Sequence, residues 1–194
     1  MNAFKSIAMA TVLAASTSLP VLAADNYSID SDHTWVGFSI GHAGWANAHG
    51  QFRKVSGDIV FDQDNFSKSK VSVVIDATSV DTNHEKRDQH VTSGDFLNTS
   101  EFSKIVFESN KIEKTGDKTF LVHGKMTLAG VSRDLVLDAQ WNSESPLPWD
   151  PKTIKTGFSA TTTINGADFG MSKLLAYGIG PDIHVQIDVE AVQQ

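Results

Sequence analysis

The chain has 194 residues, with 16 Lys and Arg against 23 Asp and Glu, and it contains no cysteine. A formal charge of −7 without a basic cluster argues against binding to nucleic acids or to anionic lipid headgroups. The lack of cysteine excludes disulfides and thiolate-bound metals as a source of stability.

The N-terminal segment is typical of a secretory signal peptide. Lys5 gives a positive start, residues 7–22 are mostly apolar, and the small residue Ala23 precedes the expected cut. A membrane anchor is the alternative, but the segment is too polar and is broken by Pro20. We therefore expect cleavage after residue 23 or 24, with a signal peptide over residues 1–23 and a single domain over residues 24–194. We also expect a periplasmic location and no transmembrane segment in the remaining chain.

The first strands are indicated by alternation of apolar and polar residues. A short strand is predicted over residues 27–30 and a long one over residues 34–42. The positions that share one face of the long strand are Val36, Phe38, Ile40 and His42. Residues 50–61 predict one bent strand or two, with a bulge at Gly57.

Residues 71–108 predict a strand, a short helix and a second strand. We expect Asn83 or Thr82 to cap the helix, Glu85 to add an early negative charge, and Gly94 to end it. The apolar positions that alternate in the two strands are Val73, Ile75, Ile105 and Phe107. This helix is the only convincing one in the predicted mature chain.

The second half of the chain predicts further strands over residues 120–128, 131–141, 156–164 and 183–190. Their expected inward positions include Val122, Met126, Leu137, Phe158, Val185 and Ile187. Residues 143–153 and 165–182 predict irregular loops, because the first is rich in proline and the second in glycine.

About eight or nine strands joined mostly by short turns indicate an all-β antiparallel fold, either a sandwich or a barrel. The last strand is regular and ends almost at the C-terminus. Pairing it with a strand near the N-terminus would close a barrel and remove both exposed edges. We therefore predict a barrel of about eight strands, with one short helix between two of them that covers one mouth.

The predicted interior is almost wholly hydrocarbon and aromatic. Thirteen residues are expected to contact a ligand there: Val36, Phe38, Ile40, His42, Val73, Ile75, Phe107, Val122, Met126, Leu137, Phe158, Val185 and Ile187. Small residues at mid-strand, Gly124, Ala139 and Ala160, leave volume unfilled. The residues alone leave open whether large neighbours fill this space or whether it holds one small ligand.

Catalytic signatures are weak. The run from His84 to Asp88 resembles the zinc-protease motif HExxH, but Asp88 replaces the second histidine, so a solvated helix face is the better interpretation. There is no GxSxG nucleophile motif and no phosphate-binding glycine loop. We predict no catalytic residue, no metal ligand and no cofactor.

Nine short motifs lie in order across the mature chain. They are Tyr27-x-Ile-Asp30-x-x-His33, Val36-x-Phe38-x-Ile40-x-His42, Gly50-x-Phe52, Asp81-Thr82, Glu85-x-Arg87-Asp88-x-His90, Asp95-Phe96, Ile105-x-Phe107-x-Ser109, Gly124-x-Met126-Thr-Leu128-x-Gly130-Val-Ser-Arg133 and Asp168-Phe169-Gly170-Met171. In these motifs the chain resembles the YceI-like proteins, which are bacterial periplasmic polyisoprenoid-binding proteins. It departs from them at Asp134, where many members carry proline, and at Gly166, where arginine is common.

The resemblance implies a lipocalin-like barrel with an elongated apolar cavity. The implied ligand is a polyisoprenoid or an isoprenoid quinone, or another long amphiphile, and the implied role is a non-enzymatic carrier. Two alternatives stay open: a metal-dependent enzyme acting on such lipids through His84, Asp88 or nearby histidines, and a ligand-free module acting in envelope stress. A homodimer is also left open. His42 is our hypothesis for a polar group near the headgroup, with a hydrogen-bonded rim histidine as its plainer role.

Overall fold

The structure is a computed structural model that describes residues 24–194. The expected signal peptide, residues 1–23, lies outside the described residues. The described chain contains one α-helix, α1 (Glu85–Thr92), and a few short 3₁₀ turns. No helix within residues 24–194 combines the length and the apolar character that crossing a bilayer requires.

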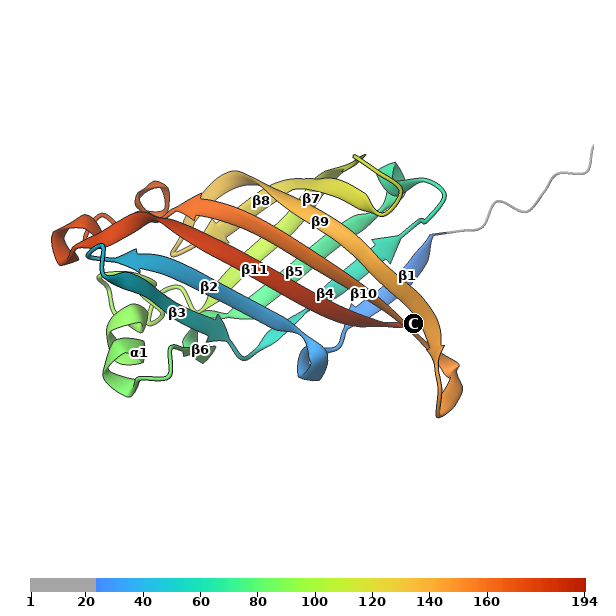
Figure 1. Ribbon diagram of the computed structural model, residues 1–194, viewed down its shortest axis with the longest axis horizontal. Coiled ribbons are helices and arrows are strands. Elements are labelled where there is room, and N and C mark those ends of the chain that lie inside the picture. The colour runs from blue at the N-terminus through green and yellow to red at the C-terminus, as the bar shows by residue number, and fades with distance from the viewer. Residues whose placement is uncertain (1–23) are drawn as a thin grey trace, which may run out of the picture.

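Most of the described chain is β-strand (Figure 1). The strands are β1 (Asp25–Ile29), β2 (Trp35–His42), β3 (Ala46–Phe52), β4 (Val55–Phe61), β5 (Lys70–Asp76), β6 (Val80–Asp81), β7 (Lys104–Lys114), β8 (Thr119–Leu128), β9 (Val131–Leu147), β10 (Asp150–Asn165) and β11 (Ile179–Gln193). All neighbouring strands pair antiparallel.

Strands β1, β4, β5, β7, β8, β9, β10 and β11 form a closed ring, because β11 pairs back with β1. The prediction of an antiparallel barrel of about eight strands is therefore confirmed. The last strand closes it as expected: residues 191–193 of β11 pair with β1, and residues 179–188 pair with β2.

At three positions around the barrel, two short strands placed end to end do the work of one long strand. β1 and β2 both lie along β11, β3 and β4 follow each other alongside them, and β5 and β6 continue the next wall. The ladder between β5 and β7 ends at the pair of Asp76 and Lys104. Beyond this point the chain leaves the wall to form α1 and the segment that follows it.

The prediction of an irregular loop over residues 143–153 is wrong. β9 and β10 continue as a paired ribbon as far as Leu147 and Asp150, and the hairpin protrudes from the barrel (Figure 1). β8 accompanies β9 only to Gln140, so this part of β9 has an open edge on that side. Pro146 is tolerated there because an edge position does not require its missing N–H group. β11 likewise begins at Ile179, four residues before its expected start.

The bulge expected at Gly57 is also wrong, because the pairing of β4 with β5 runs through this position without a shift. The glycine is needed for close approach instead. A Cβ atom at position 57 would lie 2.1 Å from the carbonyl oxygen of Ser72 on β5. Any side chain would therefore push the two strands apart.

An ion-pair cluster ties the closing seam of the barrel, where the chain passes from β1 to β2. The Lys155 ammonium on β10 donates to Asp30 at 2.6 Å and to Glu190 on β11 at 2.7 Å. The bond from Lys155 is the largest cause that lowers the pKa of Asp30 to about 2 from its ordinary value of 3.8, and His33 adds to the effect. The Lys155 and Asp30 side chains are 18% and 19% exposed and that of Glu190 is 46% exposed, so the bond to Asp30 is the better shielded of the two.

We expect Lys155→Met to lower the free energy of unfolding at pH 7 by about 2 kcal/mol, because it leaves two carboxylates without their donor. Urea unfolding measures this. Since the pKa of Asp30 is depressed in the folded state, its contribution is complete above about pH 4 and is lost as the pH falls towards 2.

The difference between the wild type and Lys155→Met should therefore shrink over that pH range. Lys152→Met, on the same strand but exposed, is the matched control and should change stability little. Equal stability of the two variants at pH 7 would contradict the role of the cluster.

Candidate functional site

The barrel contains two adjoining apolar cavities. The inner cavity has a volume of about 140 Å³ and the outer one about 380 Å³. Both touch Val36, Ile75, Met126 and Val185, so they are successive parts of one lumen. The polar residues along the inner part are Ser69, Ser159 and Thr162. Such a lining suits a hydrocarbon chain and offers little to a polar molecule.

All thirteen residues predicted to contact a ligand line this lumen. The inner part contains Val36, Val73, Ile75, Phe107, Val122, Met126, Leu137, Phe158, Val185 and Ile187, and the outer part adds Phe38, Ile40 and His42. Alternation along each strand therefore identified the inward face correctly. Contact with a ligand remains a prediction for each of them.

The end of the barrel away from α1 is filled by aromatic side chains. The ring centroid of Phe61 lies 5.5 Å from that of Phe66, 5.3 Å from that of Trp141 and 5.1 Å from that of Phe158. Phe120 lies 5.4 Å from Phe66 and adds a further buried ring. The lumen is therefore blind at this end. Aromatic clusters of this kind add to packing beyond the area that they bury.

The small residues behave differently from one another. A Cβ atom at Gly124 would lie 2.5 Å from the Phe107 ring, so this phenylalanine already occupies the space that the glycine leaves. Ala139 and Ala160 instead line the inner cavity. The expectation of unfilled volume is therefore wrong at Gly124, and the two alanines leave the room that the inner cavity uses.

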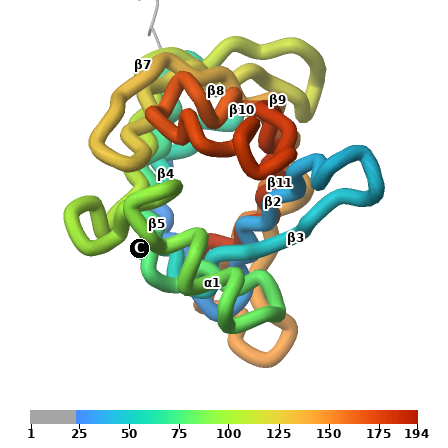
Figure 2. Tube along the Cα trace, turned by 90° about the vertical axis from the view of Figure 1, so that its left-hand side faces the viewer, coloured from blue at the N-terminus to red at the C-terminus, as the bar shows by residue number. Residues whose placement is uncertain are grey.

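The other end of the barrel is the mouth, and α1 lies across part of it (Figure 2). Arg87, His90 and Val91 of the helix line the outer cavity directly. The prediction that the helix covers a mouth agrees with this placement. Further polar groups on the wall of the outer cavity come from the strands and loops around it: His42, His49, Thr82 and Tyr177. Polarity is therefore concentrated at the open end.

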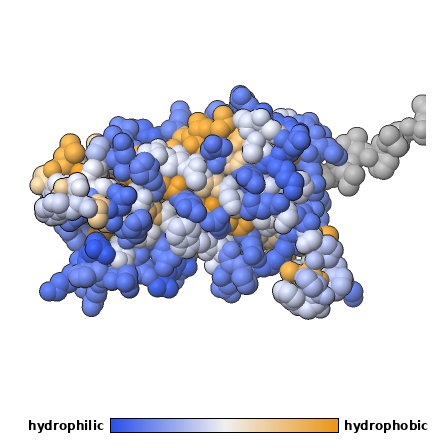
Figure 3. All heavy atoms as spheres, viewed as in Figure 1, coloured by the Kyte–Doolittle hydropathy of each residue, from blue (hydrophilic) through white to orange (hydrophobic). Residues whose placement is uncertain are grey.

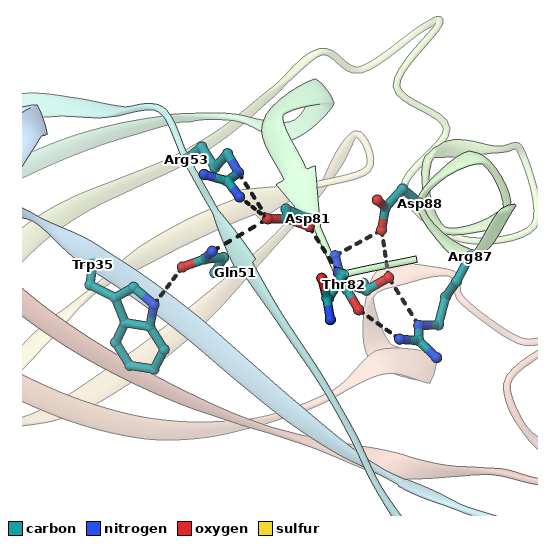
Figure 4. Close-up of polar contacts among 8 residues, drawn as sticks. Trp35, Gln51, Arg53, Asp81, Thr82, Arg87 and Asp88 are labelled. Carbon is teal, nitrogen blue, oxygen red and sulfur yellow. Dashed lines mark hydrogen bonds and ion pairs between the residues drawn. The ribbon is translucent and has the colours of Figure 1, made fainter. Parts of the chain in front are cut away.

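The helix is fixed by hydrogen bonds to the turn before it (Figure 4). The Asp88 carboxylate accepts bonds from the backbone N–H of Thr82 at 2.8 Å and from its hydroxyl at 2.5 Å. The Nε and Nη2 groups of Arg87 donate to the Thr82 hydroxyl at 2.9 Å and to its carbonyl at 2.6 Å. Both side chains thus hold α1 at the mouth.

The cap expected at Asn83 or Thr82 is wrong, because His84 is the N-cap. Its Nδ1 atom accepts from the backbone N–H of Arg87 at 3.3 Å. Asn83 lies in the left-handed region, with φ of 59°, and donates its N–H to Asp81 at 2.8 Å. Asparagine tolerates this conformation, so it turns the chain into the helix rather than capping it. The helix ends at Thr92, two residues before the expected Gly94.

Asp81 anchors the same turn to the barrel wall. Its carboxylate accepts from Asn83 and from Arg53, whose Nε lies 2.8 Å away, and these bonds lower the pKa of Asp81. Gln51 donates to it at 3.4 Å and accepts from the Trp35 indole at 2.7 Å (Figure 4). The start of the helix is therefore tied to β2 and β3.

A second polar cluster joins the helix side of the mouth to the loop before β11. Asp95 accepts from the Lys173 ammonium, from the Tyr177 hydroxyl at 3.0 Å and from His90 at 3.3 Å. The Lys173 bond is the largest cause that lowers the pKa of Asp95 to about 2, followed by the Tyr177 bond. The His90 ring also packs edge-on against Phe96 and Tyr177. We call these five residues the mouth latch.

Comparison with known proteins agrees with this architecture, since residues 27–191 match the YceI-like domain. The chain belongs to the YceI-like family. A UPF0312 protein from Vibrio parahaemolyticus is 35% identical over 188 residues, which cover 95% of this chain and 97% of that protein. The resemblance inferred from the sequence motifs is therefore confirmed.

Two solved structures share the fold. The crystal structure of a Campylobacter jejuni YceI protein aligns with a TM-score of 0.67 at 31% identity and covers 77% of this chain and 86% of that one. A polyisoprenoid binding domain from Saccharophagus degradans, implicated in plant cell wall breakdown, aligns with a TM-score of 0.63 at 19% identity. That alignment covers 87% of this chain and 98% of the domain. The YceI fold is thus shared with a domain named for polyisoprenoid binding.

The two departures from the family pattern have local explanations. Gly166 is buried, and a Cβ atom there would lie 2.4 Å from Leu174 Cδ1. An arginine at this position would displace Leu174, which lines the outer cavity. Asp134 is exposed on β9 and pairs with the Lys125 ammonium on β8 at 2.9 Å.

The residues that suggested a metal have other partners. His84 caps α1 and Asp88 binds Thr82, as described above. Within residues 24–194, one group of three His or acidic residues has its ligand atoms within 4.8 Å of one another: Asp30, His33 and Glu190. The Lys155 ammonium bonds both of its carboxylates, so a cation already neutralises this cluster.

Sequence reasoning missed the loop residues of the mouth. Buried apolar groups outside the regular strands line the outer cavity: Phe96, Leu97, Met171 and Leu174. Loops carry no periodic pattern that would reveal which side chains point inward. The motifs that contain Asp95-Phe96 and Asp168 to Met171 were the available signal, since a phenylalanine beside a turn aspartate indicates an apolar anchor.

We expect Lys173→Ala to loosen the mouth, because Asp95 loses its strongest donor. Backbone amide exchange should become about twofold to fivefold faster in residues 94–98 and 171–178, and should stay unchanged in the barrel strands. Hydrogen exchange with mass spectrometry checks this.

Lys111→Ala is the control for the latch, since it removes an ammonium paired with Glu113 at 2.5 Å on the barrel wall. Identical exchange at both segments in the two variants would mean that the ion pair does not hold the mouth.

Proposed function

We propose that this protein is a periplasmic carrier that holds a long-chain isoprenoid lipid, of polyprenyl or quinone type, inside the barrel. One observation carries the proposal: the lumen is apolar and blind at one end, and polar groups gather at its only described mouth. An amphiphile with one tail and one head matches this distribution. The tail would enter first and the head would stay near α1.

The comparisons support the lipid class. The chain belongs to the YceI-like family, and its fold is shared with a domain named for polyisoprenoid binding. The N-terminal segment, with its positive start, apolar run and small residue before the expected cut, supports export to the periplasm. A carrier that takes lipids from an envelope membrane would need that location.

The energetics favour a carrier over a permanent store. Burying a methylene from water is worth about 0.8 kcal/mol, so a chain of about twenty carbons gains about 15 kcal/mol relative to water. A membrane already supplies most of this gain, so moving the chain from membrane to lumen changes the free energy little. The contacts made by the head must therefore decide whether the ligand stays.

Several groups at the mouth are suited to a carbonyl or hydroxyl head. His42, His49 and His90 can bond through their rings, Arg87 supplies donors, and the Tyr177 hydroxyl, whose proton is donated to Asp95, can accept from a hydroxyl head. Arg87 and His90 belong to α1, whereas Tyr177 belongs to the loop before β11. A head bound among them would therefore link the helix to that loop. The proposal assigns no catalytic residue.

Organic extraction and mass spectrometry of freshly purified protein test the function directly, and we expect one retained long-chain lipid per chain. Val185→Trp should reduce retention by at least about tenfold, because Val185 lies where the two cavities join and the larger ring would divide the lumen.

Gln186→Trp is the matched control, since the neighbouring residue faces the outer wall of the same strand. Circular dichroism establishes that both variants fold. Full retention of lipid by folded Val185→Trp would show that the ligand does not occupy the lumen.

His42→Ala tests the headgroup hypothesis. We expect about fivefold weaker binding of ubiquinone-10, because a quinone carbonyl loses one hydrogen-bond partner. Binding of squalene, an isoprenoid hydrocarbon without a polar head, should not change. Unchanged binding of both ligands would show that His42 does not contact the headgroup and is only a residue of the rim.

A further inference from the structure

Two segments lie together at the mouth: residues 41–48, which form the end of the β2–β3 hairpin, and residues 170–180, which lead into β11. We call them the rim tip. It exposes three large apolar or amphipathic side chains. Trp45 is 82% exposed, Leu175 is 67% exposed and Tyr177 is 47% exposed. Exposed apolar groups gathered at one place on a protein mark an interaction site more often than scattered ones do.

The two segments of the rim tip are joined to each other. The backbone N–H of Ala43 donates to the carbonyl of Gly178 at 2.7 Å, and His42 pairs with Ile179 in the ladder between β2 and β11. Ala43 and Gly178 both have left-handed backbone conformations, with φ of 50° and 69°. Trp45 and Leu175 therefore stand on one connected structure, although 130 positions separate them in the chain.

The rim tip is almost free of charge, although the chain as a whole is acidic. Residues 41–48 contain no Asp, Glu, Lys or Arg, and residues 170–180 contain one such residue, Lys173. Its ammonium is paired with Asp95 in the mouth latch. Burial of this tip would therefore leave no isolated charge without water, in contrast to the rest of the surface.

The rim tip also borders the outer cavity. His42, Leu174, Tyr177 and Ile179 line that cavity, whereas Leu175 is exposed. Of these two consecutive leucines, Leu174 thus faces the lumen and Leu175 faces the outside. Apolar side chains are visible at this end of the molecule in Figure 3, at the left of the view, among largely hydrophilic surroundings.

We propose that the rim tip inserts into the interfacial layer of a lipid bilayer, so that the mouth opens directly onto the membrane. The inference rests on the proposed function, because a membrane is the source and destination of the lipid. A tail that crossed water would lose about 0.8 kcal/mol per exposed methylene, so direct contact removes the main barrier to transfer.

The chemistry of the tip fits that layer. Trp and Tyr are favoured at membrane interfaces, where an apolar ring and a polar edge are both satisfied. A leucine beside them adds purely apolar area. The attraction is hydrophobic rather than electrostatic, so binding should not require anionic lipids. The negative charge elsewhere on the surface keeps other faces of the protein off such membranes.

The test uses the exported protein, phosphatidylcholine vesicles that carry ubiquinone-10, and ligand-free phosphatidylcholine vesicles as acceptors. The variant is the double substitution Trp45→Ser with Leu175→Ser. Trp149→Ser is the matched control, because Trp149 is 81% exposed at the β9–β10 hairpin, at the other end of the barrel (Figure 1). Vesicle association is measured by flotation, and transfer by the quinone that reaches the acceptors.

We expect the double variant to float with vesicles about tenfold less and to transfer quinone about tenfold more slowly, with the control unchanged. Loading of the double variant from an ethanol solution of ubiquinone-10 should equal that of the wild type, which shows an intact lumen. Equal flotation and transfer rates in all three proteins would overturn the proposal. So would an altered monomer–dimer equilibrium in the double variant without any change in flotation, since the tip would then contact a second copy.

If no protein takes up quinone from ethanol, the proposed function fails. Flotation with ligand-free vesicles still tests in that case whether the rim tip binds a bilayer. Wild type and Trp149→Ser should float, whereas the double variant should not.

Discussion

The barrel depends on hydrogen bonding along both edges of β11. One edge is covered by β10, and the other is shared between β2 and then β1. This closure joins the two edges of the eight-strand ring, and it requires successive side chains to point alternately into the lumen and out to water. The Lys155 cluster lies where β1 gives way to β2 on that shared edge. Charge therefore reinforces the seam at the place where the ladder changes partner.

The two ends of the barrel differ in what fills them. At one end, Phe61, Phe66, Phe120 and Trp141 pack ring against ring and leave no passage. At the other end the regular wall stops early, because β5 and β7 separate beyond Asp76, and loops with one helix complete the circumference. Loops pack less densely than interdigitated rings, and the wider cavity lies among them. The position of the hollow thus follows from where the strand ladder ends.

The strands and the inward positions could be predicted from the sequence, because apolar and polar residues alternate along a half-buried strand. The residues that form the mouth could not be predicted in this way. Tyr177 and Lys173 meet Asp95 across about eighty positions, and no local pattern encodes that meeting. The cap at His84 was missed because asparagine before a helix usually caps it, whereas Asn83 here uses its left-handed backbone to turn the chain. The prolines of residues 143–153 predict a loop, because the sequence does not reveal that β8 ends early and leaves this part of β9 with an open edge.

The aromatic plug has a consequence for traffic. A tube that is stopped at one end cannot act as a conduit between two membranes, because whatever enters must leave through the same opening. Each delivery by such a carrier would require the whole molecule to let go of one surface, tumble and approach another. Throughput would then depend on diffusion and on how long the protein dwells at each surface, and a single chain could never span the gap as a fixed bridge.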